Sequence, residues 1–498
     1  MKKRSVGLVL SYANTFLNMV TGLFLSSFLL RQLGDTEYGV YQTIASFANY
    51  LVLLEFGTGT VMSRNLAACR AKGQTGLEVE KNISTIWMIT NFLALLIAGA
   101  STIFYFSLDA IYTKTLTPEQ ISSGKCILIF ITIYLLASFY VQTLNGIMLA
   151  YEDYTYASST SIVRIISRTA LLCVLILLIK KSIVIAIVDA AINLLLAIFG
   201  YIYATKKFKI KINLKNFDTT ILKAVLPLSL AIFMQAIVNQ ANSNVGKFIL
   251  GVSVGPEEVA IYSVGLYVYS IFASLSTIPV SMYVPQVTKD VISGKDGREL
   301  TDTLIRPSRL IVVVSGAVFF GFFAAGRQFV NIVYGEKYSI AWLVALILIA
   351  PAFLSVTLAL VINVVDAKNK RLQRSFIVLF TSCINIVLTT FLIKRWGIIG
   401  VAASTGLSIL LQVCILCVYY SKAINIRVLH LFYRTYKGIL LYHTIGAGVG
   451  FFVGNQIPNM YLSLLASGMT YVIIAFGGYL IYEKISKRKS VKKQGENK

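Results

Sequence analysis

Two arginines, Arg164 and Arg168, lie inside an apolar stretch that the sequence predicts to be a helix over residues 157–179. Residues four apart share one face of a helix, so the two guanidinium groups point the same way. Arg168 lies about 22 Å along the helix from the polar turn at residues 152–153, at 1.5 Å per residue. A guanidinium at that depth in a membrane needs a carboxylate partner or a hydrated cavity.

Two interpretations of this arginine pair stay open. In the first, Asp189 on the sixth predicted span or Glu55 on the second forms a structural ion pair with them. In the second, the arginines line a basic cavity for an anionic head group, because the planar guanidinium binds phosphate bidentately. Arg31 and Lys247, at the outer ends of two other spans, would extend that cavity into a basic track.

Amide and hydroxyl side chains repeat at helical spacing in two further segments. The rows, each at i, i+4 and i+7, are Asn14, Asn18 and Thr21 within residues 6–30, and Gln235, Asn239 and Asn242 within residues 222–247. Amides facing lipid are costly, so these faces point inward. They predict either hydrogen bonding between helices or the polar wall of a substrate cavity.

The elements that carry these residues are membrane helices. Of 498 residues, 57% are hydrophobic and only 13% are charged, whereas a soluble domain carries about 25% charged residues. Apolar stretches of about 20 residues recur along the whole chain. We therefore predict an all-α polytopic membrane protein of about fourteen transmembrane helices.

The basic residues orient this predicted bundle. With both termini in the cytoplasm, the cytoplasmic segments hold 33 of the 45 Lys and Arg residues and the opposite side holds ten. This asymmetry is the one that the positive-inside rule predicts. The net charge of +24 is thus spread over short loops, whereas a nucleic-acid-binding protein gathers it on one domain, so we expect no nucleic-acid partner.

An internal repeat predicts the domain organisation. A shift of 221 residues aligns Gly34 with Gly255, Glu37 with Glu258 and Tyr41 with Tyr262, and it also aligns the two polar rows. The predicted parts are an N-terminal lobe of six spans (1–205), a basic linker (206–221), a C-terminal lobe of six spans (222–422), and two last spans with a basic tail (423–498). In the linker, apolar residues alternate with lysines, which suits either an anionic membrane surface or a solvated loop.

The sequence lacks the residues that several classes of function require. Each Gly-Lys pair is followed by a residue other than Ser or Thr, so no phosphate-binding loop for ATP is present. Two histidines, His430 and His443, are too few for a metal site, and we expect no cofactor. No loop predicted outside the membrane exceeds about twenty residues, which disfavours an integral-membrane glycosyltransferase or polymerase. We expect no enzyme activity.

Three segments carry a resemblance to a known family. They are Arg31-Gln-Leu-Gly-Asp-Thr-Glu-Tyr-Gly-Val-Tyr41, Gly146-Ile-Met-Leu-Ala-Tyr-Glu152 and Val333-Tyr-Gly-Glu-Lys-Tyr-Ser339. In these and in its plan of six, six and two helices, the chain resembles the polysaccharide-transporter (Wzx-type) branch of the multidrug/oligosaccharidyl-lipid/polysaccharide flippase superfamily.

The resemblance implies a flippase of the bacterial cytoplasmic membrane. It would move undecaprenyl-diphosphate-linked oligosaccharide repeat units to the outer leaflet by alternating access, for O-antigen, capsule or exopolysaccharide synthesis, and we expect it to act as a monomer among membrane lipids. The basic residues would bind the diphosphate, while the amides and the Tyr262 ring would bind sugar. A cation-coupled multidrug antiporter of the same superfamily is the alternative, and for it the resemblance implies an acidic coupling residue, for which Asp189 and Glu55 are the candidates.

Overall fold

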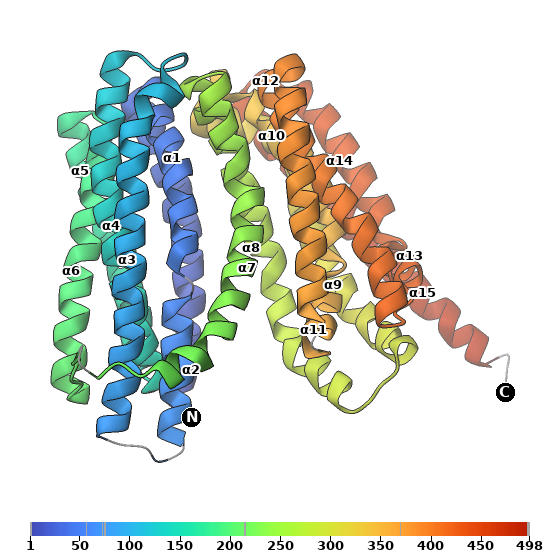
Figure 1. The fold of residues 1–498 in the computed structure, drawn as a ribbon. Coiled ribbons are helices and arrows are strands. Elements are labelled where there is room, and N and C mark those ends of the chain that lie inside the picture. Colours follow the sequence, from blue (N-terminus) through green and yellow to red (C-terminus); the bar gives the residue numbers. More distant parts are fainter. Residues whose placement is uncertain are drawn as a thin grey trace. The chain divides into compact units, whose positions relative to one another are not determined.

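The structure is a computed structural model that describes residues 2–55, 57–71, 73, 76–213, 216–368 and 370–495. Every regular element in these ranges is a helix, which confirms the all-α prediction (Figure 1). The chain divides into two compact units, Met1–Ala260 and Ile261–Lys498. The four-part division predicted from the repeat stays a prediction.

The first unit is a bundle built around one central helix. Its elements are α1 (Lys2–Leu51), η1 (Val52–Glu55), α2 (Thr58–Ala71), α3 (Leu77–Tyr112), α4 (Pro118–Ala150), α5 (Tyr154–Ile179), α6 (Ile183–Phe208) and α7 (Thr219–Ser253). Helix α4 packs against α1, α2, α3, α5 and α6, and α7 packs against α1. Figure 1 shows α3, α4, α5 and α6 side by side along their lengths.

Sequence signals at the chain turns explain where these helices begin and bend. Thr117 forms a capping box with Gln120 ahead of Pro118, so α4 starts there. Within α1 the backbone leaves the helical region at Gly34 (φ 77°). Its partner in the repeat, Gly255, also has a positive φ of 144°. Glycine adopts such angles without steric cost, so each aligned glycine allows the chain to turn between two helices.

The second unit is also a bundle of helices. After α8 (Pro256–Ile292), which begins in the first unit, its elements are α9 (Gly297–Tyr334), η2 (Glu336–Tyr338), α10 (Ile340–Val356), α11 (Ala359–Ala367), α12 (Arg371–Ala423), α13 (Val428–Tyr436), α14 (Ile439–Asn455) and α15 (Met460–Gly495). Helix α9 packs against α10, α13, α14 and α15. Its start is specified by a capping box between Asp296 and Glu299.

The helices confirm a multi-pass membrane protein. Within the described ranges, ten helices are long and apolar enough to cross a membrane, or up to eleven if the bent pair α13 and α14 is one span. Helices α1 and α12 each contain an internal break, at Gly34 and Gly397. The exact number of spans, expected at about fourteen, stays a prediction.

Helix α5 shows how one helix can face both lipid and protein. Val163, Val174 and Leu178 are more than half exposed, as suits side chains that face acyl chains, whereas Leu172 and Ile176 are fully buried. The two faces follow the 3.6-residue period. The arginines of the same helix are half-buried and lie beside buried Ile165.

The basic linker packs its apolar side onto the protein. Ile210 is 8% exposed, and it joins a core with Val61, Met62 and Ile83, against which Phe208 and Ile212 also pack. Lys209 and Lys211 are exposed between them. The linker's main chain is tied to α3 as well, since the Asn213 and Asp218 amides donate to the hydroxyls of Ser84 and Thr85 at 3.0 Å each.

Candidate functional site

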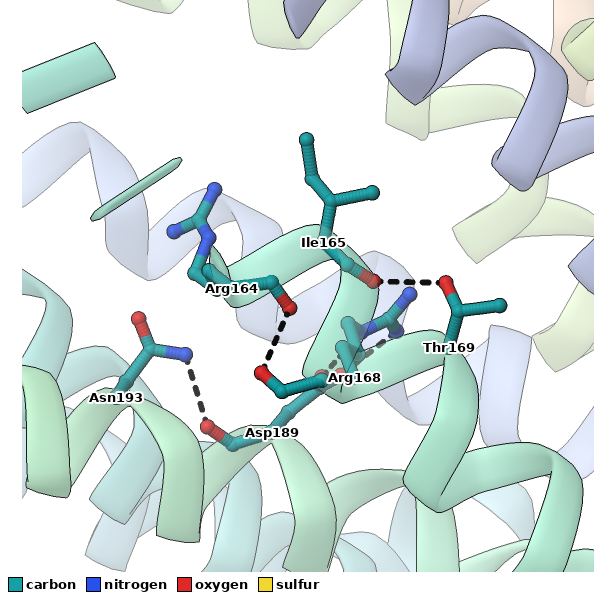
Figure 2. Close-up of polar contacts among 7 residues, drawn as sticks. Arg164, Ile165, Arg168, Thr169, Asp189 and Asn193 are labelled. Atoms are coloured by element: carbon teal, nitrogen blue, oxygen red, sulfur yellow. Dashed lines mark hydrogen bonds and ion pairs between the residues drawn. The ribbon is translucent and has the colours of Figure 1, made fainter. Parts of the chain in front are cut away.

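Arg168 is held by a carboxylate of the neighbouring helix. Its Nε and Nη2 atoms donate to the two carboxylate oxygens of Asp189 on α6, the second bond measuring 2.9 Å (Figure 2). Such two-pronged pairs are among the strongest charge-assisted hydrogen bonds. Asn193, one turn further on α6, donates its amide to the Asp189 main-chain oxygen at 2.8 Å. Of the two acids considered from the sequence, Asp189 is therefore the partner of Arg168, and Glu55 is not.

Arg164 differs from Arg168 although it lies on the same helix face. No described carboxylate lies within ion-pair distance of its guanidinium, and none of its side-chain nitrogens donates to a described acceptor. Figure 2 shows the Arg164 guanidinium directed away from Asp189. The ion-pair interpretation thus holds for one arginine, whereas the other keeps its charge available.

A cavity of about 210 Å³ within the first unit exposes both arginines. Its walls come from α1, α4, α5 and α6, and its polar lining includes Asn18, Thr21, Tyr134, Arg164, Arg168 and Asn193. Two members of the polar row predicted on the first span, Asn18 and Thr21, therefore face this cavity. Thr21 also donates its hydroxyl to the Leu17 main-chain oxygen at 2.5 Å.

A second cavity, of about 440 Å³, adjoins the first. The two share Tyr134, Arg164 and Asn193, so Arg164 contributes to both. The additional lining includes six aliphatic hydroxyl or amide side chains: Ser138, Gln142, Asn145, Ser158, Thr160 and Ser161. A volume of this size lies in the range of about 300–1,000 Å³ that small-molecule sites occupy.

The sequence contained a signal for this second cavity that our sequence reasoning missed. Ser138, Gln142 and Asn145 lie at i, i+4 and i+7 on α4, which is the spacing of the polar rows recognised on the first and seventh spans. Glu55, at the end of η1, also lines this cavity. No described side chain forms an ion pair or hydrogen bond with it.

Other residues predicted for the site lie elsewhere. Lys247 on α7 donates to Gln42 Oε1 at 3.4 Å, and Gln42 in turn donates to the Tyr38 hydroxyl. Arg31 is exposed, and neither it nor Lys247 lines the two cavities. Tyr262 is only 1% exposed. The roles of these residues in substrate binding stay predictions.

Four predicted amides lie outside the described side chains. They are Asn14, Gln235, Asn239 and Asn242. Their helices, α1 and α7, pack against each other within the first unit.

Comparison with known proteins identifies the family. The sequence profile of the family described as "Polysaccharide biosynthesis protein" matches residues 6–289, more than half of the chain. This chain belongs to that family. The probable low-salt glycan biosynthesis flippase Agl15 of Haloferax volcanii is 25% identical over 183 residues, which cover 36% of this chain and 38% of that protein. The match thus spans well under half of that relative.

Solved structures share the fold over much greater lengths. The lipid II flippase MurJ, in an inward closed conformation, matches with a TM-score of 0.72 at 14% identity, over 98% of this chain and 99% of that one. A multidrug resistance MATE family transporter of the MOP superfamily, facing inward, matches with a TM-score of 0.64 at 13% identity, over 83% and 94%. The resemblance inferred from the sequence is confirmed in family and fold.

Proposed function

We propose that this protein is a flippase for lipid-linked oligosaccharides in the bacterial cytoplasmic membrane, with undecaprenyl diphosphate as the lipid carrier. It would work by alternating access, with both termini in the cytoplasm, in the synthesis of a surface polysaccharide. Its family, its similarity to a probable glycan flippase and its transporter fold support a protein of this kind.

The observation that carries the proposal is the Arg164 guanidinium, which has no ionic partner among the described residues and lines two cavities. Arg164 lies roughly 9 Å, and Arg168 roughly 15 Å, from the start of the candidate span Ser158–Ile179. A cation at such depth costs several kcal/mol unless it is hydrated or paired. A diphosphate would provide the missing negative charge, whereas a neutral substrate would not.

The two arginines would then have different roles. Arg164 would bind a phosphate oxygen through charge-assisted hydrogen bonds. Arg168, already neutralised by Asp189, would position α5 against α6 and contribute little net charge. The hydroxyl and amide groups of the second cavity would bind sugar, since they offer several donors and acceptors at separate positions.

Translocation in proteoliposomes tests this proposal. Purified protein would be reconstituted with a fluorescent undecaprenyl-diphosphate-linked oligosaccharide, and transfer would be followed with a membrane-impermeant quencher. Arg164→Ala should slow transfer by at least about tenfold, because a hydrogen bond to a charged group contributes about 1.5–3 kcal/mol. Arg164→Lys should retain part of the rate. Arg298→Ala, at an exposed position on α9, serves as the matched control.

Wild-type transfer by Arg164→Ala would overturn the assignment of Arg164, and wild-type protein that transfers no lipid-linked sugar would overturn the function itself.

One observation favours a cation-coupled multidrug antiporter as the second candidate. Glu55 lines the larger cavity together with the rings of Tyr134 and Tyr156, so an acid and aromatic faces meet in one space. An antiporter of this kind would export a cationic dye in exchange for protons, and Glu55→Gln would abolish that export. Dye export by the wild-type protein, without transfer of lipid-linked sugar, would favour this function over the flippase.

A further inference from the structure

A third cavity lies at the end of the first unit where the basic linker leaves α6. Its volume is about 490 Å³. Its wall is formed by the last turn of α2, the start of α3, the turn after α4 and residues 208–211. None of the residues that line it lines the two cavities around Arg164.

One side of this cavity is a built cationic surface. Arg70 Nη1 donates to the Ala150 main-chain oxygen at 2.6 Å. The Arg70 guanidinium lies over the Tyr151 ring, with Cζ 4.2 Å from the ring centroid, and the Phe208 ring stacks on Tyr151 at 4.2 Å between centroids. These contacts fix the plane of the guanidinium and leave its other N–H groups without a described acceptor. A fixed, partly free guanidinium is suited to bind a phosphate oxygen.

Two further cations stand beside Arg70. Lys209 and Lys211 line the cavity and are exposed, because Ile210 between them is turned into the core. Among the described residues that line the cavity, one is a carboxylate, Glu80, which accepts a hydrogen bond from the Asn216 amide at 3.0 Å. Three cations against one acid give the cavity a net positive charge that favours an anion.

The other side of the cavity is apolar, and this distinguishes a lipid from a soluble anion. Leu77, Val79 and Phe208 line it, and Leu77 is 58% exposed. Three candidate membrane spans have an end here, at Leu77, Ala150 and Phe208. The cavity therefore lies at the depth where lipid head groups and the first carbons of acyl chains are found. It presents cations to the head groups and apolar side chains to the acyl carbons.

We propose that this cavity binds an anionic phospholipid of the surrounding membrane. Arg70, Lys209 and Lys211 hold the head-group phosphate, and Leu77, Val79 and Phe208 contact the first part of an acyl chain. The bound lipid holds the linker, the last turn of α2 and the start of α3 at the surface of one membrane leaflet. This site is independent of the proposed transport function, because it shares no residue with the cavities of Arg164.

Lipid binding to the full-length protein in detergent tests this site. Native mass spectrometry would measure the apparent Kd of phosphatidylglycerol and of phosphatidylcholine. The variant Lys209→Gln with Lys211→Gln removes two charges from the cavity, and the control Lys206→Gln with Lys223→Gln removes two exposed charges that do not line it. The first pair should weaken phosphatidylglycerol binding about twenty-five-fold, since each lysine near an anionic head group contributes about a factor of five. The control pair should change it less than threefold.

Three results would overturn this proposal. Equal losses of phosphatidylglycerol affinity in the two double variants would show that general surface charge, and not this cavity, is responsible for binding. Displacement of phosphatidylglycerol by inorganic phosphate at equal concentration would make the cavity a site for a soluble anion. Displacement by undecaprenyl diphosphate at a far lower concentration than phosphatidylglycerol would assign the cavity to the transport substrate.

Discussion

Arg168 and Asp189 join α5 to α6 through two parallel hydrogen bonds, while Arg164, one turn earlier on the same face, meets no described carboxylate (Figure 2). The side chains of the pair are 34% and 14% exposed, so water reaches the arginine more than the acid. One helix thus carries a neutralised cation and an available one. This contrast separates a role in folding from a role in substrate binding.

We expect Asp189→Ala to destabilise the protein strongly. It leaves the half-buried Arg168 charge without its carboxylate. Breaking a fully buried pair from one side costs about 3–5 kcal/mol, and the 34% exposure of Arg168 places the loss at the lower end of that range or below it. The measurement is the melting temperature of detergent-solubilised protein, read by fluorescence-detected size exclusion after heating. Arg164→Ala, which breaks no described ion pair, should melt as the wild type does, and exchanging the two charges (Arg168→Asp with Asp189→Arg) should recover much of the loss.

If Asp189→Ala melts at the wild-type temperature, the ion pair contributes nothing to the fold and its assigned role is wrong.

The close approach of α2 and α4 should not tolerate a methyl group. At Gly146 an added Cβ would overlap the Gly59 main-chain oxygen and lie 3.0 Å from Met62 Cβ. Small residues allow membrane helices to approach closely, and overpacking costs about 1–3 kcal/mol. We therefore expect Gly146→Ala to lower the melting temperature. Gly99→Ala is the control, because its Cβ would have no neighbour within 4 Å; equal behaviour of the two variants would contradict the prediction.

Asp153, in the turn between α4 and α5, should make the stability of the folded protein fall at acid pH. Burial alone would raise the pKa of the Asp153 carboxyl, but hydrogen bonds from Lys207 and Tyr203 outweigh it and hold that pKa below its usual range. A lowered pKa stabilises the folded protein above the unfolded value of about 3.9. This contribution disappears as the pH falls through the folded pKa, so part of the loss of stability below about pH 4 should belong to Asp153.

Asp153→Asn removes the charge but keeps the helix cap. The Tyr156 main-chain N–H now donates to Asp153 Oδ1, and it can donate to the Asn side-chain oxygen in the same way. The variant should melt at a lower temperature than the wild type at pH 7, and this difference in melting temperature should be smaller at pH 3. A difference in melting temperature that is the same at both pH values would show that the charge is not responsible.

The buried Tyr471 hydroxyl should stabilise the packing of α14 and α15 against α9. The His443 Nδ1 atom and the Tyr471 hydroxyl lie 2.6 Å apart, and that hydroxyl also donates to the Gly316 main-chain oxygen at 3.3 Å. Tyr471→Phe removes both bonds and leaves the buried His443 Nδ1 atom without this partner, at a cost of about 1–3 kcal/mol. We expect a clear loss of thermal stability. Tyr461→Phe, at a position 67% exposed on the same helix, should cause none; similar melting of both variants would refute this.

Local properties of the sequence determined the class of this protein. Hydropathy, loop charge and the helical spacing of polar residues are read within twenty residues or so, and they predicted a helical membrane protein with two arginines on one face. The repeat also aligned Gly34 with Gly255, and each of the two has a positive φ. The motifs around Arg31 and Gly146 carried the resemblance that the family profile confirmed.

Only the tertiary structure decided what each charge meets. Asp189 and Glu55 are equally plausible partners of Arg168 in the sequence, and the packing of α5 against α6 selects Asp189. The same packing leaves Arg164 between two cavities. Packing of the linker on α2 and α3 turns Ile210 inward, so that its lysine neighbours face outward. Pairing of charges depends on distances of a few ångströms between segments remote along the chain. Such distances follow from how whole helices pack, which the spacing of residues within any one helix does not specify.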